Sequence, residues 1–187
     1  MNYPKLFAIT SPSGGGKTSI IKVVLERHPE IKFSISATTR PMRSGEVNGR
    51  EYFFLSQEEF QTLIEHDELV EYEQLYTDYY GTLQREVNRA LQAGSCMIFD
   101  VDVKGARSIQ QKYPNEAVLI FIMPPSLEIL EQRLRSRKTE NEEKIQRRLS
   151  RAKMELEIGK TFPHIIVNDD LSRAINETEN IIQSYLS

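Results

Sequence analysis

Short runs of consecutive apolar residues recur along the chain, and longer polar or mixed stretches separate them. A strand buried on both faces is apolar throughout, so these runs predict the strands of a parallel sheet. Their alternation with helical stretches predicts an α/β fold whose ligand lies at the carboxyl ends of the strands. The runs are Leu6-Phe7-Ala8-Ile9, Cys96-Met97-Ile98-Phe99, Ala117 to Met123 and Ile165-Ile166-Val167.

Helix signals occupy the stretches between these runs. The segment Ser56-Gln57-Glu58-Glu59 is a capping box, which predicts a helix toward Glu65. A second helix, Leu127 to Arg137, is expected after Pro124-Pro125-Ser126. An apolar helical pattern also follows the first strand, at Ile20, Ile21, Val23, Val24 and Leu25.

Residues 33–82 break the alternation of strands and helices. They are rich in Ser, Thr, Tyr, Arg and Glu and carry two strand-like pieces, Phe33-Ser34-Ile35-Ser36 and Glu51-Tyr52-Phe53-Phe54-Leu55, which predict a small separate sheet. We interpret the region as an inserted substrate module.

A second departure is the charged stretch from Leu130 to Lys153. Arginines at positions 133, 135, 137, 147, 148 and 151 are interleaved with glutamates at 140, 142 and 143. Composition alone favours a solvated helical hairpin. With a triphosphate site elsewhere in the chain, a lid that covers phosphates becomes the better interpretation.

That triphosphate site is predicted by a glycine-rich segment between the first strand and the first helix. Backbone N–H groups in such a turn form an anion cradle, Lys17 can reach the outer phosphates, and the Thr18 hydroxyl can hold Mg²⁺. Ser11 stands where this motif usually has glycine and should avoid positive φ. A turn that binds nothing is the weaker alternative. The segment is Ser11-Pro12-Ser13-Gly14-Gly15-Gly16-Lys17-Thr18.

Length and composition narrow the class of protein. A chain of 187 residues with 39% hydrophobic residues fits one domain with insertions. A net charge of −3 and a pI near 5.7 provide no general attraction to nucleic acid or to an anionic membrane. Cys96 is the only cysteine, which suits a reducing compartment. Without a signal-peptide core or an apolar run of ~20 residues, we expect a cytoplasmic protein.

A second group of residues could bind a phosphorylated acceptor. Arg40 and Arg43 lie three residues apart in a predicted turn, and Tyr52 follows; arginines with a nearby tyrosine hydroxyl suit a phosphate dianion. Asp100 and Asp102 end an apolar strand, where a period of two directs both carboxylates to the same side, near the glycine-rich loop. A carboxylate close to Mg²⁺ is what phosphoryl transfer requires.

Together these motifs resemble the guanylate kinases, a family of nucleoside monophosphate kinases, over nearly the whole chain. Besides the glycine-rich segment, the matching pieces are Ser36-Ala37-Thr38-Thr39-Arg40 with Arg43, Gly45-Glu46-Val47-Asn48-Gly49 to Tyr52, Glu71, Tyr79-Tyr80-Gly81-Thr82, Asp100-Val101-Asp102, Pro124-Pro125-Ser126 and Val167-Asn168-Asp169-Asp170. The resemblance implies a P-loop fold that transfers the γ-phosphoryl group of ATP to GMP, and also to dGMP, with Mg²⁺.

The resemblance also implies a division of labour along the chain. The core would comprise 1–32, 83–125 and 160–187, the GMP-binding region 33–82, and the lid 126–159. ATP would bind at residues 11–18, and Mg²⁺ at Thr18 and Asp100. The GMP phosphate would bind at Arg40, Arg43, Tyr52 and Tyr80, and the guanine at Ser36, Glu71, Thr82 and Asp102. The catalytic cations would be Lys17, Arg43, Arg133, Arg137 and Arg148, with Arg135, Arg147 and Arg151 on a solvated face.

Two other functions stay open from the sequence. One is a binding module of the same fold that has lost catalysis, although such modules typically lack the glycines and lysine of the phosphate loop, which are present here. The other is a kinase for a different phosphorylated acceptor; a carboxylate at Glu71 favours guanine, which presents N1–H and the 2-amino group side by side as donors. A monomer and a homodimer are equally compatible with the sequence.

Overall fold

A five-stranded parallel sheet forms the centre of the molecule. The computed structural model describes residues 4–136 and 142–186, and its central sheet has the order β2-β7-β1-β8-β9. All strand pairs in it are parallel. The predicted α/β class is therefore confirmed, and each predicted apolar run forms a strand. The strands are β1 (Leu6–Thr10), β2 (Lys32–Phe33), β7 (Met97–Asp100), β8 (Ala117–Met123) and β9 (His164–Val167).

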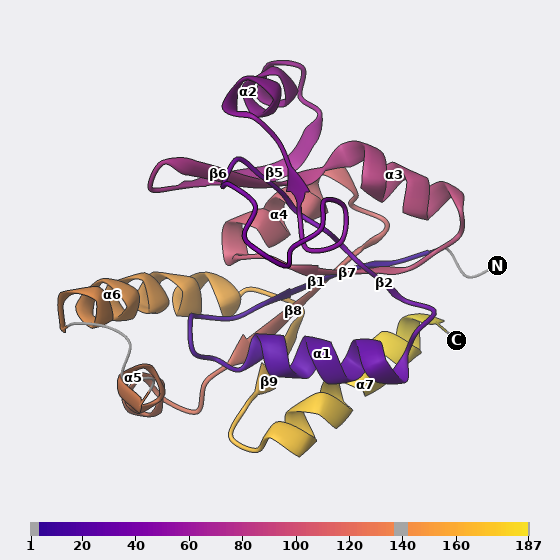
Figure 1. Cartoon of the computed structure of the whole chain (residues 1–187). Helices are drawn as coiled ribbons and strands as arrows, with labels where there is room; N and C mark the ends of the chain where they lie inside the picture. Colours follow the sequence, from indigo (N-terminus) through magenta and orange to yellow (C-terminus); the bar gives the residue numbers. More distant parts are fainter. Residues whose placement is uncertain (1–3, 137–141, 187) are drawn as a thin grey trace.

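Side chains of the middle strand point alternately to the two faces of this sheet. Leu6 and Ala8 belong to one apolar cluster, with α3 (Gln84–Gln92) and α4 (Val103–Lys112). Phe7 and Ile9 belong to another, with α1 (Lys17–Arg27) and α7 (Leu171–Leu186). The strand is buried throughout because helices cover both faces (Figure 1). Because both faces are covered, a ligand can approach this strand only at its carboxyl end, where the glycine-rich loop begins.

A second, mixed sheet lies apart from the first, on the side of α3 and α4 (Figure 1). Its order is β4-β3-β6-β5, and β5 and β6 form an antiparallel hairpin. Phe60 of α2 (Gln57–Glu65) packs on this sheet, and α2 begins at the predicted capping box of Ser56 and Glu59. The strands are β3 (Ala37–Thr38), β4 (Phe53–Phe54), β5 (Leu69–Leu75) and β6 (Asp78–Leu83).

The prediction for Phe33 is wrong. Phe33 pairs with Ile98 in the central sheet and not with the second sheet. The cause is the open edge of β7, where the Lys32 and Ser34 amides donate to the carbonyls of Cys96 and Ile98, each at 2.9 Å. The chain therefore crosses from one sheet to the other between Ser34 and Ala37. The second predicted piece contracts to Phe53–Phe54.

The arginine-rich stretch forms two helices, α5 (Leu127–Ser136) and α6 (Glu142–Gly159). Leu130 and Leu134 of α5 pack against Ala152 of α6. The helix predicted to end at Arg137 is described as far as Ser136. Arg137 itself lies outside the described residues.

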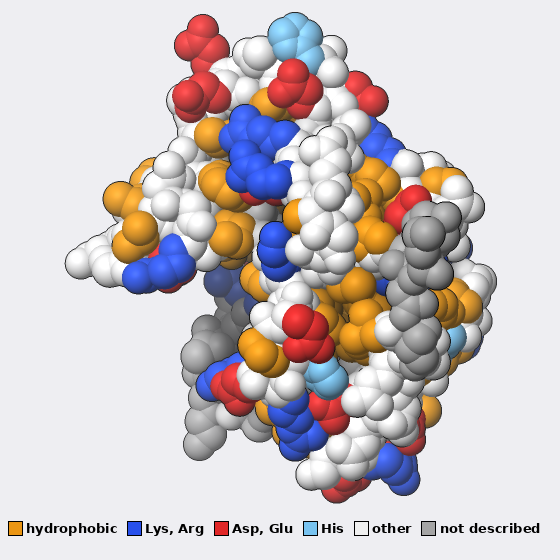
Figure 2. All heavy atoms as spheres, turned by 90° about the vertical axis from the view of Figure 1, so that its right-hand side faces the viewer, with side chains coloured by type: hydrophobic (Ala, Val, Ile, Leu, Met, Phe, Trp, Pro, Cys, Tyr) orange, Lys and Arg blue, Asp and Glu red, His pale blue; other side chains and the backbone are white. Residues whose placement is uncertain are grey.

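On the face shown in Figure 2, basic and acidic side chains are interspersed, with hydrophobic groups exposed between them. None of the helices in the described ranges is long and apolar enough to cross a membrane.

Candidate active site

The glycine-rich loop joins the carboxyl end of β1 to the first turn of α1. Gly14 has a φ of 92° and Gly16 a φ of 95°, in the left-handed region that side-chain-bearing residues avoid. Gly16 is also the N-cap position of α1, and no side chain caps that end. The first N–H groups of α1 thus face the loop, which makes this helix end a candidate anion site.

Ser11 fits the first position of the loop without strain. Within 4–136 and 142–186, the residues other than glycine with positive φ are Asp67 and Tyr76, so Ser11 has an ordinary backbone conformation. Its hydroxyl donates to the Pro12 carbonyl at 3.1 Å. A Cβ at Gly15 would lie 2.9 Å from the Ser11 Cβ, so the serine packs closely on the bare glycine backbone.

Asn168, just after β9, fastens the loop from the opposite side. Its buried amide donates to the Gly15 carbonyl at 2.7 Å. A Cβ on Gly16 would lie 2.2 Å from the same nitrogen, which leaves no room for a side chain there. Arg133 of α5 in turn donates to the Asn168 carbonyl at 2.9 Å. Asn168 belongs to one of the motifs that carry the family resemblance, but the sequence pattern gave no sign of this contact with the loop.

Lys17 is held at the end of the neighbouring strand β7. Its Nζ lies 2.6 Å from Oδ1 of Asp100 and donates to the Val101 carbonyl at 2.7 Å. The side chain is 14% exposed, so the ammonium group is largely shielded. The Asp100 carboxylate therefore lies beside the glycine-rich loop, as predicted, and its direct ion pair with Lys17 is a contact that the sequence did not predict.

A cavity of about 510 Å³ opens over this loop. Arg148 of α6 reaches the loop from the far wall, and its guanidinium donates to the Ser13 hydroxyl at 2.9 Å. Leu75 and Tyr76, at the tip of the β5–β6 hairpin, also line the cavity. The remaining lining residues are Ser11, Pro12, Ser13, Gly14, Gly16, Lys17, Thr18, Ser19, Asp102, Arg148, Arg151 and Glu155.

Thr18 and Asp100 are the two oxygen donors predicted for a metal. Thr18 lies exposed at the start of α1, and the Asp100 carboxylate is 32% exposed. The described part of the chain has no group of three or more His, Cys, Asp or Glu side chains that could hold a metal. This donor set suits Mg²⁺, which binds one or two protein oxygens together with substrate phosphates and water.

Arg40 and Glu46 form the centre of a second polar group. Two guanidinium nitrogens of Arg40 donate to the two carboxylate oxygens of Glu46, at 2.8 and 3.1 Å. Glu46 also accepts from the Arg43 amide at 2.7 Å, and this contact lowers the pKa of Glu46 together with the dominant hydrogen bond from Arg40. The Arg43 side chain is exposed. The orienting role of Glu46 was missed in the sequence, although a carboxylate six residues after an arginine in a predicted turn is a usable signal.

Two tyrosines stand beside this arginine. The guanidinium carbon of Arg40 lies 5.4 Å from the ring centroid of Tyr52, and the rings of Tyr52 and Tyr80 meet edge to face at 6.1 Å. Burial raises the pKa of the Tyr52 phenol, which keeps its hydroxyl as a donor. The structure thus brings together Arg40, Tyr52 and Tyr80, three of the four residues predicted for the acceptor phosphate, with Arg43 at the rim.

Glu71 and Thr82 face each other across the β5–β6 hairpin. They are register partners, and the Thr82 hydroxyl donates to Oε1 of Glu71 at 2.7 Å. Burial raises the pKa of Glu71 to about 7, and the negative charges of Asp102 and Glu73 act in the same direction. Ser36 is partly buried on the neighbouring segment, where its carbonyl accepts from the Phe53 amide at 2.9 Å.

Asp102 caps the first turn of α4. Its Oδ1 accepts from the Gly105 amide at 2.8 Å, and its Oδ2 accepts from Arg151 at 2.8 Å. The sequence placed Asp100 and Asp102 on one side of a strand, but β7 ends at Asp100 and Asp102 belongs to the helix cap. Asp100 therefore faces Lys17, whereas Asp102 faces the guanidinium of Arg151.

The prediction of a solvated-face role is wrong for Arg151. Its guanidinium binds carboxylates from three segments of the chain, those of Glu73, Asp102 and Glu155. Glu155 is only 4% exposed, and burial raises its pKa. Nothing in the pattern of charges marked Arg151 off from Arg135 and Arg147, which lie on the surface and pair with glutamates of α5 and α6.

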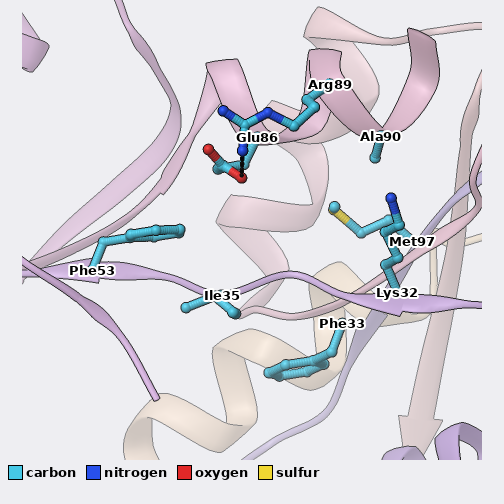
Figure 3. A pocket seen from close by; sticks show the side chains of 8 residues that line it. All are labelled: Lys32, Phe33, Ile35, Phe53, Glu86, Arg89, Ala90 and Met97. Atoms are coloured by element: carbon cyan, nitrogen blue, oxygen red, sulfur yellow. Dashed lines mark hydrogen bonds and ion pairs between the residues drawn. The ribbon is translucent and has the colours of Figure 1, made fainter. Parts of the chain in front are cut away.

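A second cavity, of about 300 Å³, lies away from the loop, between the β2 edge and α3 (Figure 3). Phe33, Ile35 and Phe53 contribute an apolar wall, and Arg89 donates to Glu86 at 3.2 Å beside it. Among the described residues, none of those predicted for the site lines it.

Comparisons with known proteins agree with this geometry. The family model described as guanylate kinase matches residues 3–185. A guanylate kinase of Chlorobium luteolum is 42% identical over 183 residues, which cover 98% of this chain and 93% of the relative. One of Gloeobacter violaceus is 45% identical over 178 residues, covering 95% and 86%.

Among solved structures, the crystal structure of guanylate kinase from Anaplasma phagocytophilum superposes with a TM-score of 0.73 at 27% identity. The superposition covers 98% of this chain and 87% of the Anaplasma phagocytophilum chain. A P-loop with its lysine in place, a second sheet carrying a partly buried carboxylate and a family match over nearly the whole length agree with one another. The chain belongs to the guanylate kinase family.

Proposed function

We propose that the phosphoryl transfer of this kinase, from ATP to GMP with formation of ADP and GDP, takes place between the P-loop and the second sheet. The observation that carries this proposal is the pair of the buried Thr82 and the partly buried Glu71, in which the threonine hydroxyl orients a carboxylate whose oxygens can accept further hydrogen bonds. Guanine offers two adjacent donors, N1–H and the 2-amino group, to such a carboxylate. Adenine offers no such pair.

The ATP phosphates are proposed to bind at residues 11–18. Backbone N–H groups of the loop and the Lys17 ammonium supply positive charge there, and Arg133 and Arg148 approach from α5 and α6. Lys17 is held by Asp100 and Val101 before ATP arrives, so its charge is already placed. Arg137 is proposed to join them on the strength of the family resemblance.

Thr18 and Asp100 are proposed to hold Mg²⁺, because both are accessible oxygen donors beside the loop. When bound, the ion neutralises charge on the β- and γ-phosphates. The Asp100 carboxylate already forms an ion pair with the Lys17 ammonium. We therefore propose that Asp100 both orders the ligands around Mg²⁺ and anchors Lys17.

The GMP phosphate is proposed to bind Arg40, Arg43, Tyr52 and Tyr80. Glu46 and the Pro41 carbonyl engage three N–H groups of Arg40, and a guanidinium has five. Tyr80 also interacts with this guanidinium, so a rigid fork oriented by Glu46 and a phenol hydroxyl beside it can meet phosphate oxygens together. The exposed Arg43 side chain can meet the same dianion.

The reaction needs no general base from the protein. The attacking group is an oxygen of the GMP phosphate, whose second pKa of about 6 leaves it largely ionised at neutral pH. The protein has only to align two polyanions and to neutralise the charge on the transferred group. This is why the proposed residues are cations and hydroxyls, with carboxylates reserved for guanine and for Mg²⁺.

Closure of residues 33–82 and 126–159 over the two nucleotides is proposed to exclude water, which would otherwise hydrolyse ATP. Amide exchange tests this: with GMP and a non-hydrolysable ATP analogue together, α6 and the β5–β6 hairpin should gain protection. Identical exchange with and without the nucleotides would contradict closure.

An acceptor assay with ATP and Mg²⁺ tests the function. GMP and dGMP should be phosphorylated, IMP poorly and AMP hardly at all. If AMP or a sugar phosphate is the better acceptor, the chain is a kinase for another substrate. We place the reaction in the cytoplasm, since the partly buried Cys96 is the only cysteine of the chain.

A further inference from the structure

Arg151 joins three parts of the molecule at the guanine end of the proposed acceptor site. It projects from α6, in the stretch that follows α5. Its guanidinium donates to Asp102 at 2.8 Å, lies 3.0 Å from Glu73 and donates to Glu155 at 2.8 Å. Asp102 caps α4 in the core, and Glu73 belongs to the β5–β6 hairpin, on the same side of the molecule as α6 (Figure 1).

The two outer partners of Arg151 are tied directly to the residues that would read guanine. Glu73 lies two positions from Glu71 on β5, so both side chains lie on the same face of the strand. Asp102 is itself proposed to contact guanine, and with Oδ1 engaged by Gly105 its orientation depends on what binds Oδ2. Arg151 is that partner.

The choice of residue fits this geometry. Three carboxylates from different segments can be bound at once by a planar fork with five donors, whereas an ammonium is a compact point charge. Glu155 is buried and anchors the guanidinium to its own helix. The fork is thus fixed at the α6 end and reaches outward to Asp102 and Glu73.

We propose that Arg151 is a positioning residue that holds Asp102 and the β5–β6 hairpin in place for guanine and couples the acceptor site to the position of α6. The proposal rests on the function proposed above and deepens it. Binding of GMP would then bias the position of α6 through Arg151, in addition to any contact that α6 makes with phosphates. Arg151 itself touches no reacting atom in this scheme.

The test compares steady-state kinetics of Arg151→Met, Arg151→Lys and Glu73→Gln with those of the parent enzyme. Arg151→Met keeps the aliphatic stem and should raise the KM for GMP by about tenfold, the order expected when one charged hydrogen bond is lost, with the KM for ATP changed less than twofold. The KM for GMP of Arg151→Lys should lie between those of the parent and of Arg151→Met, because lysine keeps the charge but lacks the planar fork of donors. Glu73→Gln should raise the KM for GMP by roughly threefold.

Arg147→Met is the matched control, because Arg147 lies on the same helix, is exposed and pairs along the helix surface with Glu143. It should leave both KM values unchanged. Arg151→Met removes the partner of a buried glutamate, so its folding is checked by thermal melting. Glu73→Gln leaves that pair intact and serves as the second variant.

The proposal is overturned if folded Arg151→Met keeps the KM for GMP within twofold of the parent, or if the KM for ATP rises in its place, which would assign Arg151 to the phosphates. Amide exchange of the nucleotide-free protein gives a readout independent of substrate. Arg151→Met and Glu73→Gln should both speed exchange in the β5–β6 hairpin, and unchanged exchange in both variants also overturns the coupling. Failure of the parent enzyme to use GMP refutes the proposed function, while the exchange result still decides the coupling.

Discussion

The hydroxyl of Thr82 donates a 2.7 Å hydrogen bond to Oε1 of Glu71, its partner across the β5–β6 hairpin. The threonine thereby orients a carboxylate whose other oxygen lies close to Gly105 of α4, where a Cβ would stand 3.1 Å away. Burial raises the pKa of this carboxyl group to about 7. Only the ionised form of such a group accepts through both oxygens and donates through neither, and three predictions rest on it.

Glu71→Gln should weaken the use of GMP by about tenfold or more in kcat/KM, because hydrogen bonds to charged groups contribute roughly 1.5–3 kcal/mol and the new amide places donors against guanine donors. IMP lacks the 2-amino group and should lose less. The measurement is the ratio of kcat/KM for GMP over IMP in both proteins. A ratio unchanged within twofold would show that Glu71 does not read the 2-amino group, and the assignment would move to Ser36, Thr82 and Asp102.

The activity of the parent enzyme with GMP should rise with pH through about 7. With a pKa of about 7 for Glu71, the ionised fraction rises about tenfold between pH 6 and pH 8, and only the ionised form accepts both guanine donors. The phosphate of GMP also ionises in this range, with a pKa of about 6, and this contributes to the pH dependence of both proteins. Glu71→Gln shares that titration, so the parent profile divided by the variant profile isolates Glu71, and a flat quotient argues against its role.

The same variant should stabilise the fold at high pH. The unfolded carboxyl group ionises near 4.5 while the folded one keeps its proton up to about 7, so stability falls as pH rises through this window. Removing the charge should raise the unfolding free energy at pH 8 by roughly 1–3 kcal/mol and change it little below pH 4.5. Urea denaturation at the two pH values measures this, and equal effects at both would contradict the linkage.

Lys17→Ala should lower kcat by roughly 10²–10³, the loss seen when one preorganised electrostatic donor is removed. Lys22→Ala is the control, because Lys22 lies on the same helix, is 76% exposed and pairs only distantly with Glu26. Its kcat should stay near that of the parent. Retention of more than half of the parent kcat in Lys17→Ala would remove the lysine from the transfer step.

Asn168→Ala should destabilise the protein and weaken ATP binding. It leaves the carbonyl of Gly15 without its partner in a buried place, which costs roughly 1–3 kcal/mol and lowers Tm by roughly 2–10 °C. The KM for ATP should rise more than the KM for GMP, because the loop holds the triphosphate. Asn176→Ala, on the exposed face of α7, is the control. Equal rises in both KM values would indicate a general loss of structure rather than a local change in the loop.

The P-loop, the four apolar strands and the capping box at Ser56 follow from the sequence by itself. Each is a local pattern, in which neighbouring residues along the chain determine the backbone conformation and the face that is buried. The acceptor-site residues required the family resemblance as well, since an arginine or a tyrosine is common on any surface.

Tertiary structure alone decided the remaining relationships. Asn168 is 153 positions from Gly15, and Arg151 is 49 positions from Asp102. Phe33 joins the central sheet because β7 offers it an unpaired edge, a fact about the neighbouring strand and not about Phe33. The pKa of Glu71 likewise depends on what buries it. Such effects arise when segments distant in sequence exclude water from between them, and no local pattern records which segments will meet.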